Sequence, residues 1–93
     1  ESLDGKLLLA RAYRGANEAQ KAKELLDKAI LAQPDEPTLR AERGALARAQ
    51  EETAVAIEHY GKAVELAPDD ANLRFNLAEA LQKSSRLDDA IAG

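Results

Sequence analysis

The sequence contains no cysteine, methionine or tryptophan, and aromatic residues make up only 3% of its 93 residues. Without cysteine neither a disulfide bond nor a thiolate metal site can form, and the redox compartment stays open. The scarcity of large aromatic side chains predicts a thin core. No apolar run approaches the roughly 18 residues of a membrane span, because none is longer than Leu7-Leu8-Leu9-Ala10. The net charge of −4 and the pI of about 5.0 argue against a basic surface for DNA or RNA.

Ninety-three residues correspond to one domain or to a part of one. Because the chain begins at Glu1 rather than at methionine, we expect it to be a segment of a longer protein. Alanine, leucine, glutamate, lysine and arginine dominate, and apolar residues recur at i, i+3, i+4, i+7 and i+8. This spacing predicts amphipathic helices with a narrow, alanine-rich buried stripe. The clearest stripes are Ala22, Leu25, Leu26, Ala29 and Ile30, and then Ala56, Tyr60, Ala63 and Val64.

Two proline-containing segments, residues 34–37 (PDEP) and 68–70 (PDD), divide the chain into three blocks. In each segment proline ends one helix and an acidic residue can cap the next, while Pro37 suits a first helical turn. Each complete block is too long for one ordinary surface helix, so we expect two helices and a turn in every block. Residues 15–17 (GAN) and 83–86 (KSSR) are the expected turns of the first and third blocks. Residues 48–53 (RAQEET) contain neither glycine nor proline, and their local sequence favours one long helix instead.

The blocks repeat one another at a fixed interval. Residues 28–40 read KAILAQPDEPTLR and residues 62–74 read KAVELAPDDANLR, so the interval is the step from Lys28 to Lys62. A repeat interval of this length is typical of a repeat architecture. The chain resembles the tetratricopeptide repeat (TPR), a helix–turn–helix unit that stacks into a right-handed superhelical solenoid. The resemblance implies an all-α fold of antiparallel helix pairs in about two and two-thirds repeats, at residues 3–36, 37–70 and 71–93. The matching positions are Ala10, Gly44 and Ala78; Ala22, Ala56 and Ala90; Leu26 and Tyr60; Ala29 and Ala63; Pro34 and Pro68.

Small residues allow the two helices of a pair to approach to about 8 Å. The expected close pairs are Ala10 with Ala22, Gly44 with Ala56, and Ala78 with Ala90. The second repeat departs from the family pattern, because Arg43 and Ala47 stand where leucine and tyrosine are common. We expect it to pack more loosely, unless the arginine stem lies along the apolar surface with its head in water.

The third repeat is truncated, because its second helix would begin near Arg86 or Leu87 and the chain ends at Gly93. Such a stub would leave parts of Leu73, Leu77 and Leu81 uncovered. An uncovered apolar edge favours contact with a neighbouring repeat or with another copy of the chain. Self-association through the truncated C-terminal edge is therefore one hypothesis.

No group of residues has the spacing of a catalytic, metal or cofactor site. His59 is the only histidine and has no second ligand-type residue at a metal-binding spacing, so we expect it to face solvent. The acid pairs at residues 51–52, 69–70 and 88–89 lack the spacing of a calcium loop and fit turns and helix starts. The glycines are scattered and form no phosphate loop. We expect neither an enzyme nor a cofactor.

The resemblance implies that the first helix of each repeat lines a concave groove that receives an extended peptide or a partner helix. The partner-binding residues expected from this correspondence are Leu7, Arg11, Arg14, Ala41, Ala45, Arg48, Phe75, Asn76, Glu79 and Lys83, and the groove extends to Asp4, Leu8, Thr38, Glu42, Ala49, Asn72 and Gln82. Phe75 is either the anchor for a partner, since aromatic residues often dominate binding energy, or a residue packed against the preceding repeat. The basic residues are either ordinary solvated side chains or a site for an acidic peptide. One TPR subclass binds the C-terminal carboxylate of chaperones, but Glu42 would repel that group and no lysine is in place.

These observations predict a non-catalytic module that binds a peptide or helix of a partner protein and no nucleic acid. The alternative is a structural spacer or oligomerisation segment of a longer solenoid that makes its contacts through its edges. The alanine- and arginine-rich sequence suggests a bacterial source. A cytoplasmic and a periplasmic location are equally compatible with it.

Overall fold

The structure is a computed structural model that describes the backbone of residues 3–92 and the side chains of residues 3–86. Five helices follow one another along the chain: α1 (Leu3–Gly15), α2 (Ala19–Ala32), α3 (Pro37–Ala49), α4 (Thr53–Leu66) and α5 (Ala71–Ala92). Residues 3–92 contain no strand. The fold is all-α, as the sequence predicts.

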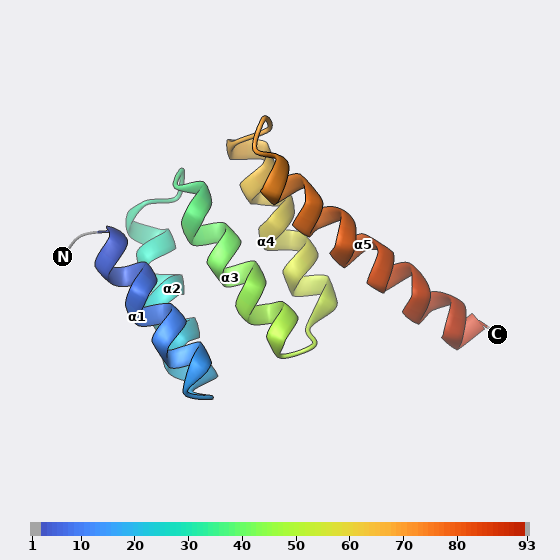
Figure 1. The fold of residues 1–93 in the computed structure, drawn as a ribbon, viewed down its shortest axis with the longest axis horizontal. Helices are drawn as coiled ribbons and strands as arrows, with labels where there is room; N and C mark the ends of the chain where they lie inside the picture. Colours follow the sequence, from blue (N-terminus) through green and yellow to red (C-terminus); the bar gives the residue numbers. More distant parts are fainter. Residues whose placement is uncertain (1–2, 93) are drawn as a thin grey trace.

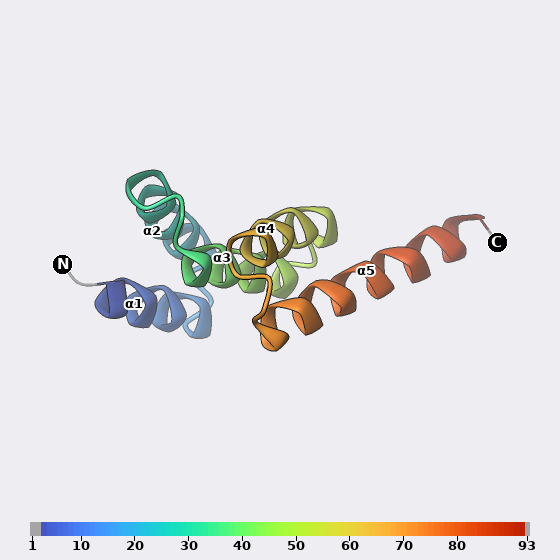
Figure 2. The same ribbon diagram turned by 90° about the horizontal axis from the view of Figure 1, so that it is seen from above.

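The helices form two antiparallel pairs, α1 with α2 and α3 with α4, and α5 follows alone (Figure 1). Seen from above, α2 and α4 lie on one side of the molecule, α1 and the start of α5 lie on the other, and α3 lies between them (Figure 2). Packing follows chain order, with α2 against α3 and α4 against α5. The predicted helical-repeat solenoid is therefore confirmed, and the first helices of its units share one face.

The core consists mainly of alanine and leucine, in two clusters around the helix pairs. Ala10, Ala22, Gly44 and Ala56 are all buried, as expected for sites of close helix approach. The nearest side chain to Gly44, however, is the ring of Tyr60 rather than Ala56. Each small residue therefore makes room for a larger neighbour as well as for a helix backbone.

The turns inside the first two units have the same backbone geometry. Asn17 has a φ of 63°, and Glu51, which stands one repeat interval later, has a φ of 61°. In both turns the next amide bonds back to a helix carbonyl at 2.8 Å, from Glu18 to Tyr13 and from Glu52 to Ala47. This arrangement ends a helix with a left-handed residue. The break that the period required near residue 51 is confirmed, although the local sequence favoured a continuous helix.

We expect Glu51→Gly to raise the free energy of unfolding by about 0.5–1 kcal/mol, because glycine adopts a positive φ without the steric cost that glutamate bears. Asn17→Gly is the matched control and should gain less, since asparagine tolerates this conformation better. Urea denaturation of the two variants measures both effects. Equal gains at the two positions would contradict the explanation.

The expected turn at residues 83–86 is wrong, because α5 runs unbroken from Ala71 to Ala92. Neither glycine nor proline interrupts this stretch. Ala78 cannot pack against Ala90 as expected, since both belong to one helix; Ala78 is exposed, and the side chain of Ala90 lies outside the described residues.

The helix starts agree in part with the expected acidic caps. The Asp70 side chain accepts hydrogen bonds from the amides of Asn72 (3.0 Å) and Leu73 (3.3 Å) at the start of α5. Pro37 occupies the first turn of α3, as predicted, but Glu36 makes no side-chain cap there and accepts a bond from Thr38 Oγ1 instead. Glutamate, with its longer side chain, is not among the residue types preferred at this capping position.

Candidate functional site: the face formed by α1, α3 and α5

The first helices of the units are joined across their shared face by two ion pairs. Arg11 Nε donates to Glu42 Oε1 at 2.7 Å and links α1 to α3. Arg48 Nη1 donates to Glu79 Oε1 at 3.5 Å and links α3 to α5. The first pair is short and its glutamate is largely buried, whereas the second pair is long and about half exposed on both sides. Only the second pair is weak enough to open at little cost.

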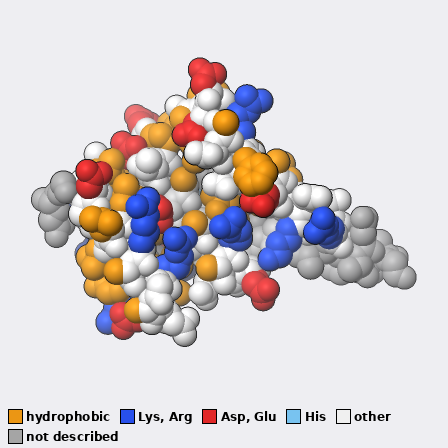
Figure 3. All heavy atoms as spheres, in the orientation of Figure 1, with side chains coloured by type: hydrophobic (Ala, Val, Ile, Leu, Met, Phe, Trp, Pro, Cys, Tyr) orange, Lys and Arg blue, Asp and Glu red, His pale blue; other side chains and the backbone are white. Residues whose placement is uncertain are grey.

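The space-filling view shows lysine and arginine side chains spread in a row across this face (Figure 3). Of the expected partner-binding residues, Arg11, Arg48, Phe75, Glu79 and Lys83 are exposed. Arg14, Ala41, Ala45 and Asn76 are half-buried. Leu7 belongs to the core, whereas its neighbour Leu8 is 65% exposed. A partner would therefore meet mainly charged side chains and one large ring.

That ring is Phe75, which keeps 64% of its surface exposed. Phe75 is therefore not buried against the preceding unit. It lies on α5 at the same helical stripe as Glu79 and Lys83, which follow at i+4 and i+8. An aromatic side chain, a carboxylate and an ammonium group thus follow one another along one side of the shared face.

A small hollow of about 170 Å³ opens beside this stripe, at the end of α3 and the start of α4. Its lining consists of Arg48, Thr53, Ala56, Glu79, Ala80 and Lys83. The two alanines are buried and form an apolar base. Thr53 is not among the predicted residues, because the prediction covered only first helices and Thr53 begins the second helix of its unit.

The phenol of Tyr60 is a polar group buried close to this face. The side chain is only 1% exposed, and its hydroxyl has no hydrogen-bond partner among the described residues. Burial raises the pKa of Tyr60, while the charges of Arg48 and Arg14 lower it and those of Glu42 and Glu79 raise it. The sequence offered one signal of this buried hydroxyl, since Tyr60 stands at the position where the first unit has the apolar Leu26.

Comparison with protein families agrees with this architecture. A sequence model described as tetratricopeptide repeat matches residues 3–36, and a second, described as TPR repeat, matches residues 46–85. The chain belongs to the tetratricopeptide repeat family. Repeats of this family generally mediate protein–protein interaction and are typically non-catalytic. No curated protein matches the chain.

Within the described part of this TPR chain, no group of three or more potential ligand residues could hold a metal ion. In the same part, no helix is long and apolar enough to cross a membrane.

Between the two TPR units lies a buried polar cluster that the sequence did not predict. Arg43 is 6% exposed, and its Nε donates to Asp27 Oδ1 of α2 at 3.0 Å. The head of Arg43 therefore does not lie in water, which was the one exception given to the looser packing expected of this repeat. The prediction that His59 faces solvent is also wrong, because this residue is 9% exposed and its Nδ1 lies 3.4 Å from Arg40 Nη1. Both residues are covered because the neighbouring unit packs over them, which the pattern of one helix does not reveal.

This cluster makes the stability of the repeats depend on pH. Burial lowers the pKa of His59 below its ordinary value of 6.5, the charges of Arg43 and Arg40 lower it further, and Glu58 and Asp27 oppose them. The unfolded chain therefore binds the proton more readily than the folded one. We expect the free energy of unfolding to fall as the pH drops below about 6.5, towards the lowered folded value.

Urea denaturation between pH 8 and pH 5 measures this slope. His59→Leu, which copies Leu25 of the first unit, is the control and should remove the histidine contribution to it. An unchanged slope in the variant would assign the pH dependence to other groups.

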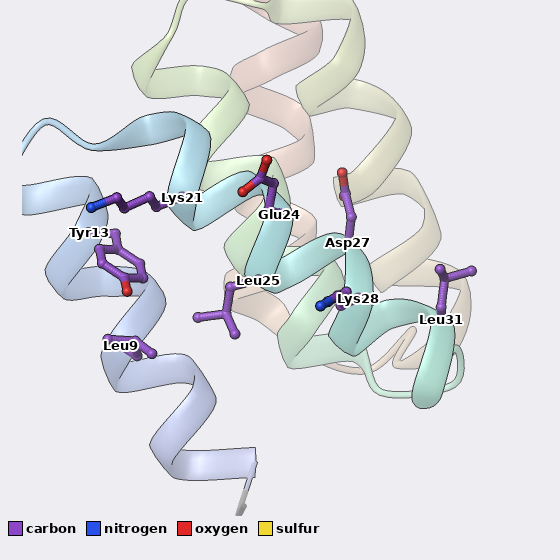
Figure 4. Close-up of a pocket in the computed structure, with 8 residues that line it drawn as sticks. All are labelled: Leu9, Tyr13, Lys21, Glu24, Leu25, Asp27, Lys28 and Leu31. Atoms are coloured by element: carbon purple, nitrogen blue, oxygen red, sulfur yellow. The ribbon is translucent and has the colours of Figure 1, made fainter.

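The other end of the TPR stack carries a larger hollow of about 710 Å³, which lies between α1 and α2 (Figure 4). Leu9 and Leu31 line it and are 43% and 83% exposed. Tyr13 and Leu25 line it as well. One repeat interval after Leu9, Tyr13 and Leu25, the second unit has Arg43, Ala47 and His59 at the equivalent positions. All three equivalents are buried, where the second unit meets α2. The hollow therefore has the form of a stacking surface with no described helix on it.

Proposed function

We propose that the face formed by α1, α3 and α5 binds a segment of a partner protein. The observation that carries this proposal is the exposed ring of Phe75, which stands on that face among charged side chains instead of packing into the core. Aromatic side chains bury a large area and are enriched among the residues that dominate binding energy. Ion pairs such as Arg11–Glu42 join the helices, so the face is preformed and binding would cost little ordering.

A capture experiment from source lysate tests the proposal with two variants, each of which changes one apolar and one basic exposed side chain. Phe75→Ala with Arg48→Glu changes the proposed face. Leu31→Ala with Lys62→Glu changes an apolar and a basic side chain that are exposed elsewhere, on α2 and α4. We expect a partner that the wild type and the second variant retain and the first variant loses, with the same circular dichroism for all three. Equal capture by all three would contradict the proposal.

A second candidate function, a spacer in a longer solenoid, is favoured by the hollow between α1 and α2. Its occupant would be the second helix of a preceding repeat, because α2 takes that place on the next unit. In such a stack Leu9 would stand where Arg43 now faces Asp27, so the added helix needs an apolar residue in place of that aspartate.

Adding a copy of residues 3–36 directly before residue 3 tests this candidate, since it preserves the repeat interval. With leucine at the position of Asp27 in the added copy, we expect a gain of about 2 kcal/mol in the free energy of unfolding, from covering exposed leucine. The same addition with aspartate retained is the control and should gain less. No gain from the leucine version would count against stacking at this surface.

Self-association through the C-terminal edge belongs to the same candidate. Leu81 on α5 is 49% exposed and no described element follows α5 to cover it. Light scattering up to high micromolar concentration should show a mass above that of the monomer, and a constant monomeric mass would exclude this contact.

A further inference from the structure

We propose that the hollow between Arg48 and Lys83 binds the carboxylate of an acidic side chain in the partner, and that the partner segment runs extended from there to Phe75. This inference rests on the proposed binding at the face of α1, α3 and α5. It adds the chemistry of the ligand and the spacing of its two contact residues.

The hollow has more hydrogen-bond donors than acceptors. Arg48 makes one long contact of 3.5 Å with Glu79, and this glutamate is the only carboxylate among the described residues of the lining. Lys83 and the Thr53 hydroxyl have no hydrogen-bond or ion-pair partner within the described side chains, although both line the hollow. Two cations and one carboxylate leave one net positive charge. The complementary group is an oxygen anion, because ionised acceptors form the strongest bonds with such donors.

Tyr60 lies behind the hollow, because it belongs to the same core cluster as Ala56 and Ala80, which line the hollow. A buried hydroxyl without a partner calls for an explanation, since most buried polar groups are hydrogen-bonded. The phenol is close enough to Arg48 and Glu79, which both line the hollow, for their charges to act on it. An anion that draws Arg48 away from Glu79 would change the surroundings of this hydroxyl as well.

The size of the hollow selects the form of the ligand. A volume of about 170 Å³ is below the roughly 300–1,000 Å³ of sites that hold whole small molecules. It has room for the end of one side chain, and none for a helix, which is about 10 Å across. The acid therefore enters as a side chain from a chain that lies along the face.

The position of Phe75 sets the distance to the next contact. Phe75 and Lys83 stand at i and i+8 on α5, which corresponds to about 12 Å at roughly 1.5 Å per residue. An extended chain advances about 3.3 Å per residue and covers this distance in three or four residues. We therefore expect an apolar residue three or four positions from the acidic one.

Selection of random peptides of about 12 residues displayed on phage, with the whole chain as the target, tests the inference although the partner is unidentified. We expect enrichment of peptides with an aspartate or glutamate three or four positions from an apolar residue. In the selected peptides, changing the acid to its amide should weaken binding to the wild type about tenfold, the scale of a lost charge-assisted bond. The same change should have little effect on the Lys83→Glu variant.

Lys62→Glu is the matched control, because it makes the same charge change at an exposed site of α4, and it should bind like the wild type. Neutral peptides that bind the wild type and are lost on Phe75→Ser would overturn the carboxylate site and leave the binding face intact. The same holds for acidic peptides that are insensitive to Lys83→Glu. If no peptide is enriched, or if all variants bind alike, both the inference and the proposed function fail.

Discussion

Gly44→Ala is expected to lower the free energy of unfolding by about 1–2 kcal/mol, although alanine is the better helix former. A Cβ at this position would lie 2.9 Å from Cδ1 and Cε1 of Tyr60. That ring is 1% exposed and cannot move without disturbing the packing of α3 on α4. Overpacking a core typically costs more than the gain in helix propensity.

Gly61→Ala is the matched control, because a Cβ there meets nothing within 4 Å. We expect it to raise the free energy of unfolding by about 0.5–1 kcal/mol, through helix propensity alone. The two glycine-to-alanine changes should thus have opposite signs in urea denaturation. If both variants changed the free energy of unfolding in the same direction, the Tyr60 ring would have to shift at little cost.

The first unit suggests a rescue for the overpacked variant. The positions equivalent to Gly44 and Tyr60 are occupied by Ala10 and Leu26, which are both buried in one cluster. The double variant Gly44→Ala, Tyr60→Leu copies this pair and should recover part of the loss, because it relieves the close contact. A double variant less stable than the sum of its single changes would contradict this complementarity of volume.

Asp27→Ala is expected to lower the free energy of unfolding by about 2 kcal/mol, because it leaves the Arg43 guanidinium buried without its acceptor. The side chain of Arg43 is 7% exposed, and the bond to Asp27 has a length of 3.0 Å. A fully buried pair loses about 3–5 kcal/mol when one partner is removed. We expect less here, since the Asp27 side chain is 46% exposed and water can replace part of the interaction.

Two further variants separate charge from burial in this pair. Glu65→Ala removes the acid of the exposed pair with Lys62, at 3.9 Å, and should change the stability by less than about 0.5 kcal/mol. Asp27→Ala combined with Arg43→Leu, which copies Leu9 of the first unit, should recover most of the loss, because apolar replacements of buried pairs are often neutral. A double variant as unstable as Asp27→Ala alone would show that the guanidinium contributes through its packing.

Much of the fold could be predicted from the period of the sequence. The repeat interval gives the number of units, and the helical stripes identify buried residues such as Leu26 and Tyr60. Within the candidate site, the period also places Arg48, Phe75 and Lys83 on first helices, where the structure shows them exposed. It could not show the hollow beside them, because Thr53 comes from a second helix and comes to line the same hollow as Lys83 only through packing.

By itself the sequence determined the local features of this protein: helices with alanine-rich stripes, the helix starts at Pro37 and Asp70, and a repeat that buries its core between units. The helical stripes and helix starts depend on neighbours a few residues apart, and the repeat shows as a fixed interval, so all of them can be read from residue type and spacing. The tertiary structure alone decided the burial of Arg43 and His59 and the unbroken course of α5. A side chain is covered only if another helix lies over it, and neither glycine nor proline marks an end within α5.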